Sequence, residues 1–265
     1  MAQVARLRVF PVKGLDGIDL EAARILEGGT LSYDREFAIV DADGEIINGK
    51  RTADVHRLDT GFDPATYTLT VETPAGERRE FDLDTDRDSC SRWLGAYCGM
   101  EVELRRDRAT GFVDRRDMGP SVVSTATLET VAGWFDELTV DSARRRLRAN
   151  VEVSGVPAFW EDRFVGANAP GFVAGGITFE GVTPCGRCVV PERDPDTGAA
   201  VADFRQQFMR KREETFPDWA DPDAFDHYYT MMLIADVPPD DRGATVRVGD
   251  PVTVLEESDV PGERD

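Results

Sequence analysis

The sequence has 265 residues, enough for one large domain or two smaller ones, and 41% of them are hydrophobic. It carries 51 acidic against 31 basic residues, which gives a formal net charge of −20. Such a charge disfavours nucleic acid and anionic membranes as partners, and no apolar run reaches the ~20 residues of a membrane span. Since no targeting segment follows Met1, we expect a cytoplasmic protein.

The basic residues are divided unevenly, because only Lys13, Lys50 and Lys211 are lysine and the rest are arginine. Acidic residues are spread along the whole chain. Dispersed carboxylates with little lysine are typical of proteins from salt-accumulating halophiles, in which concentrated salt screens the self-repulsion of the surface. The composition therefore suggests a halophilic, haloarchaeal protein, and an ordinary acidic protein is the alternative.

Short strands dominate the expected structure of the N-terminal third. Apolar residues form short runs at regular spacing, and Gly, Asp and Pro separate the runs. This pattern predicts a small barrel or sandwich. The expected strands cover residues 4–9, 37–40, 67–71, 79–83 and 101–104.

One helix is expected in this part, from Cys90 to Cys98. Both cysteines lie on one apolar face at helical spacing. Asp88 or Ser89 can cap the start of the helix, and Gly99 can end it. We therefore expect both cysteines to be reduced core residues and not parts of a disulfide framework.

A polar stretch rich in arginine and aspartate, residues 105–117, is the best candidate for a domain boundary. We accordingly expect a first domain at residues 1–105 and a second domain at residues 106–257. Residues 258–265 are expected to be a frayed acidic tail.

Helical and strand patterns alternate beyond this boundary. A helix that Ser124 or Thr125 can cap is expected, with Leu128 and Phe135 on its apolar face. The other expected elements are strands near residues 150–153 and 176–181 and a helix over residues 201–213.

The last strands are predicted to form a hairpin. Val246 and Val248 alternate with polar residues, a turn follows at residues 249–251, and Val252 and Val254 resume the alternation. Together the elements predict an α+β fold that is mostly β, with a small N-terminal β-barrel-like domain packed on a larger β-barrel domain.

The most informative segment is Cys185-Gly186-Arg187-Cys188, which a turn sequence, Asp-Pro-Asp-Thr-Gly at residues 194–198, follows closely. A structural zinc site needs four nitrogen or sulfur ligands, and the remaining cysteines and histidines form no second close pair. A thioredoxin-type pair opens a helix, whereas Pro191 and the turn follow this pair almost at once. Both the zinc and the redox interpretations are therefore weak.

Five short segments occur in the order and spacing of the MOSC family, and the chain resembles that family over nearly its whole length. The likeness is to proteins with an N-terminal MOSC β-barrel domain before the MOSC domain, as in the mitochondrial amidoxime-reducing component and its bacterial relatives. The larger predicted domain is then a MOSC β-barrel domain. The five segments are Phe10-Pro11-Val12-Lys13, Asp34-Arg35, Arg148-Ala149-Asn150, residues 185–198 and Val248-Gly249-Asp250-Pro251.

The resemblance implies a molybdenum cofactor, a pyranopterin dithiolene, between the two domains. By position, Cys188 matches the cysteine whose thiolate ligates molybdenum, and a thiolate is a soft, anionic donor suited to such a metal. Cys185 is expected to pack instead. Arg187 would favour the thiolate form of Cys188 and is counted with the cofactor-binding residues. We therefore predict that Cys188 is both the metal ligand and a catalytic residue.

The cofactor also carries a phosphate, whose binding needs fixed donors and positive charge. Lys13, Arg35 and Arg148 match the basic contacts of the family. Asn150 matches an amide contact to the pterin. Asp117 matches an acidic residue that the family uses near the cofactor, and we predict that it is catalytic.

Two positions depart from the family pattern. Met118 and Gly119 stand where the family tends to have hydroxyl residues, so that backbone N–H groups would have to make any contacts there. His56 and His227 have no partner that the sequence reveals, and both are expected to be surface or structural residues.

The resemblance implies an oxidoreductase that reduces N-hydroxylated or N-oxide compounds at molybdenum. A separate ferredoxin-type or flavin-type protein would donate the electrons. The first alternative is a carrier that holds molybdenum cofactor or sulfur for delivery, and the second is a MOSC fold without cofactor. Neither zinc, nor pyridoxal phosphate, nor an iron–sulfur cluster is expected in this chain.

Overall fold

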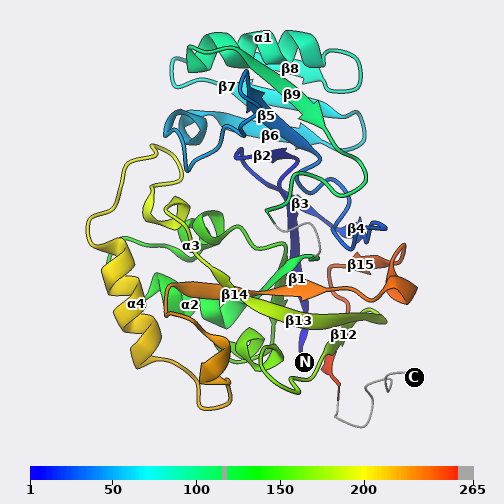
Figure 1. Ribbon diagram of the computed structural model, residues 1–265, viewed down its shortest axis with the longest axis vertical. Coiled ribbons are helices and arrows are strands. Elements are labelled where there is room, and N and C mark those ends of the chain that lie inside the picture. The colour runs from blue at the N-terminus through cyan, green and yellow to red at the C-terminus, as the bar shows by residue number, and fades with distance from the viewer. Residues whose placement is uncertain (115–117, 256–265) are drawn as a thin grey trace.

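The computed structural model describes residues 1–114 and 118–255, which form two units stacked along the long axis of the molecule (Figure 1). The smaller unit comes from the N-terminal third of the chain, and the larger unit contains most of the remainder. The fold is α+β and mostly β, which confirms the predicted class. The predicted acidic tail lies outside the described residues.

Two three-stranded sheets and one helix make up the smaller unit. Its core contains Phe37, Leu69, Phe81 and Leu94, all buried. Alternate residues of β7 are buried, as the period-2 pattern predicts for a strand with one face in the core. The elements are β2 (Val12–Lys13), β5 (Phe37–Asp41), β9 (Val102–Arg106), β6 (Asp59–Asp63), β7 (Thr68–Glu72), β8 (Arg78–Asp82) and α1 (Arg87–Cys98).

Helix α1 covers the top of this unit in Figure 1. It ends at Gly99 as predicted, because Gly99 adopts a left-handed conformation (φ 67°) and its N–H donates to Gly95 O. The helix begins earlier than expected, since Asp86 precedes its first residue. Cys90 is fully buried, and burial raises the pKa of its thiol to about 12. Cys90 is therefore a core residue, while Cys98 is half-buried.

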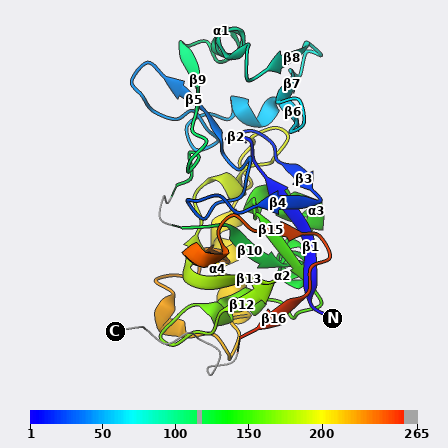
Figure 2. The same cartoon turned by 90° about the vertical axis from the view of Figure 1, so that its right-hand side faces the viewer.

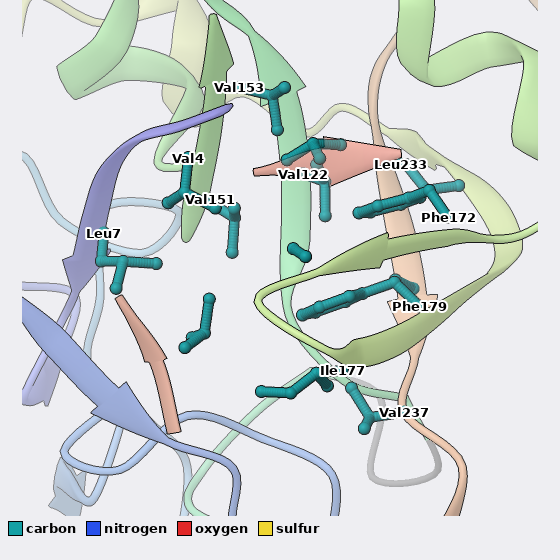
Figure 3. Packing of buried hydrophobic residues seen from close by; sticks show 14 of the residues in the cluster. Val4, Leu7, Val122, Val151, Val153, Phe172, Ile177, Phe179, Leu233 and Val237 are labelled. Atoms are coloured by element: carbon teal, nitrogen blue, oxygen red, sulfur yellow. The ribbon is translucent and has the colours of Figure 1, made fainter. Parts of the chain in front are cut away.

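An eight-stranded sheet is the framework of the larger unit, with the strand order β16-β12-β13-β14-β10-β11-β1-β3. Figure 3 shows part of its core, in which the rings of Phe172 and Phe179 stack with centroids 5.1 Å apart. Such a pair adds about 0.5–1.5 kcal/mol to the free energy of burial. The strands are β1 (Gln3–Val9), β3 (Ile18–Leu20), β10 (Ser121–Ser124), β11 (Val151–Ser154), β12 (Phe172–Ala174), β13 (Ile177–Gly186), β14 (Thr230–Asp236) and β16 (Val252–Val254).

The N-terminal strand β1 belongs to the larger unit. It pairs antiparallel with β11, and Leu7 lies opposite Val151. The chain then leaves the large sheet and enters the smaller unit at β2, so the two units share the first twenty residues (Figure 1). A division of the chain at residue 105 therefore does not separate the two units in space.

The predicted C-terminal hairpin is wrong. Strand β15 (Thr245–Arg247) pairs with β4 (Ala22–Arg24), whereas β16 pairs with β12. The turn between them is held by β1, because Val4 N donates to Asp250 O at 2.9 Å and Gly249 N donates to Val4 O at 2.8 Å. These bonds direct the two strands to different partners.

Three helices pack beside the large sheet around a third core cluster (Figures 1 and 2). Helix α2 begins after Ser124, whose hydroxyl accepts from Thr127 N at 3.0 Å, as the cap prediction required. Helix α3 was not predicted, although Ala143 and Leu147 lie at helical spacing in its arginine-rich sequence and are buried. The helices are α2 (Thr125–Ala132), α3 (Val140–Leu147) and α4 (Phe204–Glu214).

Short 3-10 helices complete the fold. None of the helices in the described ranges is both long and apolar enough to cross a bilayer. The 3-10 helices are η1 (Asp54–Arg57), η2 (Trp160–Phe164), η3 (Val190–Glu192), η4 (Pro222–Ala224) and η5 (Pro239–Asp241).

Candidate cofactor-binding site

A cavity of about 320 Å³ lies where the two units meet. The smaller unit and the first loops contribute its upper wall, and β10, β13, β14 and the end of α3 contribute its lower wall. The residues that line it include Lys13, Arg35, Gly49, Lys50, His56, Asp114, Met118, Gly119, Arg148, Asn150, Cys185, Arg187, Cys188 and Met232.

The cysteine segment lies at a distorted part of the large sheet. Strand β13 continues to Gly186, so Cys185 is in a strand and not in a loop as predicted. Pro184 pairs with Leu233 and Gly186 pairs with Thr230, which leaves two residues of β14 opposite Cys185. One of them, Met232, has φ 78°, an unusual value for a side chain of this size. This bulge bends β14 and brings Met232 to the cavity wall.

The two cysteines of the motif have different surroundings. Arg187 Nη1 donates to Cys185 Sγ at 3.1 Å, and Arg187 Nη2 donates to Leu147 O at 2.9 Å. Cys185 also packs against the third core cluster, as predicted. Cys188 lines the cavity, and its Sγ has no hydrogen-bond partner in the described ranges. Arg187 thus contacts Cys185 and not Cys188, contrary to the expectation from the sequence.

Tyr229 anchors the backbone of Cys188. The hydroxyl of Tyr229 lies 3.3 Å from Cys188 O and 3.3 Å from Glu192 Oε1. Burial, together with the charge of Glu192, raises the pKa of Tyr229, so its hydroxyl keeps its proton and acts as a donor. The segment that carries Cys188 is therefore tied by a buried side chain to the residue that precedes β14.

Lys13 forms a bridge to the segment that joins the two units. Its ammonium group donates to Phe112 O at 2.7 Å and to Asp114 Oδ1 at 2.5 Å. Burial lowers the pKa of Lys13 despite the neighbouring carboxylate. Burial alone would raise the pKa of Asp114, but the bond from Lys13 and the charges of Lys13 and Lys50 outweigh it and hold this pKa at about 2. The charge of Lys13 is therefore largely neutralised by Asp114.

Two arginines share the ring of Phe10. The guanidinium of Arg148 lies 3.9 Å from the ring centroid, and that of Arg35 lies 5.1 Å from it. Arg35 pairs with Asp34, whose carboxylate also accepts from Phe10 N. Arg148 makes neither an ion pair nor a side-chain hydrogen bond with any described residue. Burial, followed by the charge of Arg35, lowers the pKa of Arg148 to about 9.

Asn150 lines the cavity but already has protein partners. Its Oδ1 accepts from Ser121 N at 3.1 Å and from Ser121 Oγ at 2.9 Å. Its Nδ2 donates to Arg8 O at 3.1 Å, which joins β1 to the sheet. One N–H of the amide is left for a further acceptor.

The described residues contain no cluster of three or more His, Cys, Asp or Glu that could hold a metal ion. A metal in this cavity would therefore need ligands from a cofactor besides any that the protein supplies. An anionic, sulfur-bearing group fits the donors present, because the thiol of Cys188 and the guanidinium of Arg148 have no hydrogen-bond or ion-pair partner among the described residues.

Comparison with known proteins identifies the family. The MOSC N-terminal beta barrel domain matches residues 1–116, and the MOSC domain matches residues 118–253. The chain belongs to the MOSC family. The family binds molybdenum cofactor.

Distant relatives carry two different names. Human mitochondrial amidoxime-reducing component 1 is 21% identical over 294 residues, covering 95% of this chain and 82% of the relative. Mitochondrial amidoxime reducing component 2 of Macaca fascicularis is 23% identical over 94% of this chain and 82% of its own length. The molybdenum cofactor sulfurase of Drosophila yakuba is 24% identical over 78% of this chain, and the match spans only 31% of that relative.

The cavity of this MOSC protein brings together every predicted site residue that the structure describes. They come from four separate parts of the chain, and their roles toward a cofactor remain predictions. Asp117 lies outside the described residues. The residues brought together are Lys13, Arg35, Arg148, Asn150, Arg187 and Cys188.

The departure at Gly119 has a structural reason. A Cβ at position 119 would lie 2.9 Å from Gly29 O and 3.1 Å from Ala235 O, so there is little room for a side chain. The N–H of Gly119 donates to Ala235 O at 2.7 Å. It is therefore committed to the fold, and the expectation that it could serve a ligand is wrong.

Three further cavity residues were missed by the sequence reasoning. Lys50 and Asp114 extend the ion bridge of Lys13, and the scarcity of lysine could have drawn attention to Lys50. His56, expected at the surface or in a structural role, lines the cavity with a buried Nε2. No local signal marks His56, since its surroundings come from other segments.

Proposed function

We propose that this MOSC protein binds molybdenum cofactor in the cavity between its units and reduces N-hydroxylated or N-oxide compounds. The observation that carries the proposal is that residues matched to the family from four parts of the chain line one cavity, in which the thiol of Cys188 has no hydrogen-bond partner among the described residues. Similarity over almost the whole chain to amidoxime-reducing components supports this activity over others.

The charge of the cavity supports an anionic ligand. Among the described residues, five cationic side chains line it against two carboxylates, in a chain whose net charge is −20. A positive cleft in a negative surface focuses the field and raises the local concentration of anions. The cations are Lys13, Arg35, Lys50, Arg148 and Arg187, and the carboxylates are Asp34 and Asp114.

The residues of the chain would bind and orient the group. Cys188 would supply a thiolate ligand to the metal, and Tyr229 would hold the backbone that carries it. Arg148 would bind an anionic oxygen, because it has no acceptor in the described protein. The cofactor supplies the two-electron redox chemistry when bound.

Reduction of an N-hydroxyl group consumes two electrons and two protons and releases water. The chain would receive the electrons from a separate donor, for which we propose a ferredoxin-type or flavin-type protein. The predicted alternative is a carrier that delivers cofactor or sulfur, and similarity to molybdenum cofactor sulfurases supports it.

The test is expression in a host that makes molybdenum cofactor, with measurement of molybdenum and pterin in the purified protein. The loaded protein is then given a chemical reductant and an N-hydroxylated amidine, and formation of the amidine is followed. Turnover supports the reductase. Loaded protein that passes cofactor or sulfur to an acceptor without turnover supports the carrier, and protein without pterin contradicts both.

A further inference from the structure

An apolar strip lies on the outside of the segment that follows the cysteine motif. Val189 and Val201 are 38% and 39% exposed, and Ala199, Ala200 and Ala202 are exposed as well. Single exposed apolar residues need no explanation, whereas a contiguous patch of them often marks a contact with another molecule. The segment runs along the outer side of the molecule, between the end of β13 and α4 (Figure 1).

Backbone hydrogen bonds hold the two limbs of this strip side by side. Glu192 N donates to Val189 O at 3.1 Å, and Val201 N donates to Glu192 O at 2.8 Å. A further bond joins the limbs, because Asp194 N donates to Ala199 O at 2.7 Å. Val189 and Val201 therefore belong to one exposed region, although a turn separates them along the chain.

The strip lies next to the proposed metal ligand, because Val189 follows Cys188 in the chain. Tyr229 connects the two, since its hydroxyl lies 3.3 Å from Cys188 O and 3.3 Å from Glu192 Oε1. The guanidinium of Arg205, an exposed residue of α4, lies 5.0 Å from the ring centroid of Tyr229. An electron that crosses this surface therefore has a short path to a metal held at Cys188, and electron transfer slows steeply with distance.

The charge of this region differs from that of the chain as a whole. The carboxylates of the turn are paired, Asp194 with Arg146 at 3.4 Å and Asp196 with Arg145 at 2.7 Å. Residues 187–205 and these two ion-pair partners hold five arginines and four carboxylates, whereas the whole chain has a net charge of −20. An acidic partner is therefore repelled less here than by the average surface of the protein.

We propose that this strip is the docking surface of the electron donor, and that the donor is an acidic carrier of the ferredoxin type. An apolar face of the donor covers Val189 and Val201, and one of its carboxylates pairs with Arg205, which has no ion pair among the described residues. Complexes between redox proteins bury less than about 1,200 Å² in total, so a short strip is sufficient. This docking surface rests on the proposed function, since a cofactor carrier needs no electron donor.

The first experiment measures binding without turnover. A plant-type ferredoxin is titrated into the full-length protein without cofactor, and calorimetry gives the dissociation constant. Val201→Glu places a carboxylate in the strip, and Met100→Glu, the matched control, makes the same change at a residue that is 42% exposed in the smaller unit. We expect Val201→Glu to weaken binding about tenfold or more, because the new carboxylate is desolvated against an acidic partner. Met100→Glu should bind as the wild type does.

Two results would overturn the docking surface directly. One is the absence of ferredoxin binding to the wild type, or equal affinity in Val201→Glu. The other is a wild-type dimer that Val201→Glu dissociates while ferredoxin binding is unchanged, since a second copy of the chain would then cover the strip. Because Val201 is exposed, the substitution disturbs no core contact, and the folded variant can be compared with the wild type.

The second experiment tests the charged edge of the surface. We expect Arg205→Gln to weaken ferredoxin binding about threefold at low salt, and by less in molar potassium chloride, because salt screens the pair. Arg210→Gln is the matched control, since Arg210 is an exposed arginine of the same helix that already lies 3.9 Å from Glu214. Equal effects of the two variants would overturn the assignment of Arg205 to the surface.

Rates with two reductants separate the docking surface from the proposed function. Protein loaded with cofactor is given an N-hydroxylated amidine, first with a chemical reductant and then with reduced ferredoxin. We expect Val201→Glu to lower only the ferredoxin-dependent rate, by about tenfold below saturation, as its affinity falls. An equal loss with both reductants would contradict the docking surface. If neither reductant supports turnover while ferredoxin binding still depends on Val201, the docking surface stands and the proposed reductase is wrong.

Discussion

Two arginines on aromatic rings, Arg148 and Arg212, are held in opposite ways. Arg212 is fully buried in the larger unit, pairs with Asp162 and lies 4.5 Å from the ring centroid of Phe159. Arg148 lies on the ring of Phe10 at the cavity and has no carboxylate partner in the described chain. The comparison teaches that the presence of an internal partner, and not burial alone, separates a structural charge from one that is left for a ligand.

The carboxyl groups near Arg212 are also buried, which costs free energy when they are ionised. Glu161 is 1% exposed, and burial, together with the charge of Asp162, raises its pKa to about 8. Burial also raises the pKa of Asp162, although Arg212 opposes this. Two buried carboxyl groups, of Glu161 and Asp162, therefore lie in this region, and Arg212 pairs with that of Asp162.

The largest expected effect extends this contrast to the cysteines, since Cys185 has Arg187 as a partner and Cys188 has no partner for its thiol among the described residues. Cys188→Ser replaces a soft thiolate by a hard hydroxyl, so we expect loss of molybdenum and of reductase activity. Cys185→Ser, the matched control, should change little beyond local packing. The measurements are molybdenum, pterin and rate for both variants. The reverse pattern would assign the ligand to Cys185, and loss in both variants with bound zinc would contradict the family-based mechanism.

The next largest effect is expected at Arg212. Arg212→Met leaves the carboxylate of Asp162 buried without its partner, and we expect the free energy of unfolding to fall by about 3–5 kcal/mol. The double variant Arg212→Met/Asp162→Leu should recover much of this loss, because it removes the pair together. Denaturant unfolding of the three proteins is the measurement. Equal stability of the wild type and Arg212→Met would show that Arg212 is not needed for the stability of the fold, and the contrast with Arg148 would then fail.

Replacement of Arg148, unlike that of Arg212, should not lower the stability of the protein. Arg148→Met removes a cation that lacks a protein partner, so we expect the stability of the cofactor-free protein to be unchanged or higher by up to about 1 kcal/mol. Affinity for sulfate should fall about tenfold or more, as for loss of a charge-assisted hydrogen bond. Thermal melts with and without sulfate measure both effects. Destabilisation as large as that at Arg212 would show that Arg148 is a structural residue.

A smaller effect is expected from the titration of Glu161. Its pKa in the folded protein is about 8 and its ordinary value is 4.5, so between these values the folded state holds a proton that the unfolded state has lost. The stability that Glu161 contributes is complete below pH 4.5 and is lost as the pH rises toward 8, by at most about 1.4 kcal/mol per pH unit. Glu161→Gln should make the free energy of unfolding less dependent on pH between pH 5 and pH 8. If the free energy of unfolding of this variant depends on pH as steeply as that of the wild type, another group is responsible for the titration.

The smallest effect per residue is expected at the exposed carboxylates. Each contributes a few tenths of a kcal/mol of repulsion, which molar salt screens because the Debye length falls to about 3 Å. With a net charge of −20, the sum predicts a melting temperature that rises steeply between low and molar potassium chloride. A flat response would leave an ordinary acidic protein in place of a halophilic one.

Elements set by their immediate neighbours were predicted correctly. Gly99 ends α1, Ser124 caps α2, and Asp194 organises the turn after the cysteine motif by accepting from Asp196 N and Thr197 N. Each of these interactions spans only a few residues, so its signal is complete within a short segment. The family and the identity of the residues that line the cavity followed from such segments and their order.

Only the tertiary structure decided how these residues are paired. It turned the expected hairpin into two strands with different partners, assigned Arg187 to Cys185, and committed the N–H of Gly119 to Ala235. It also placed His56 beside Arg148, which the sequence leaves far apart. The physical reason is that burial and hydrogen-bond partners come from strands and loops distant along the chain, whereas periodicity and capping are properties of neighbouring residues.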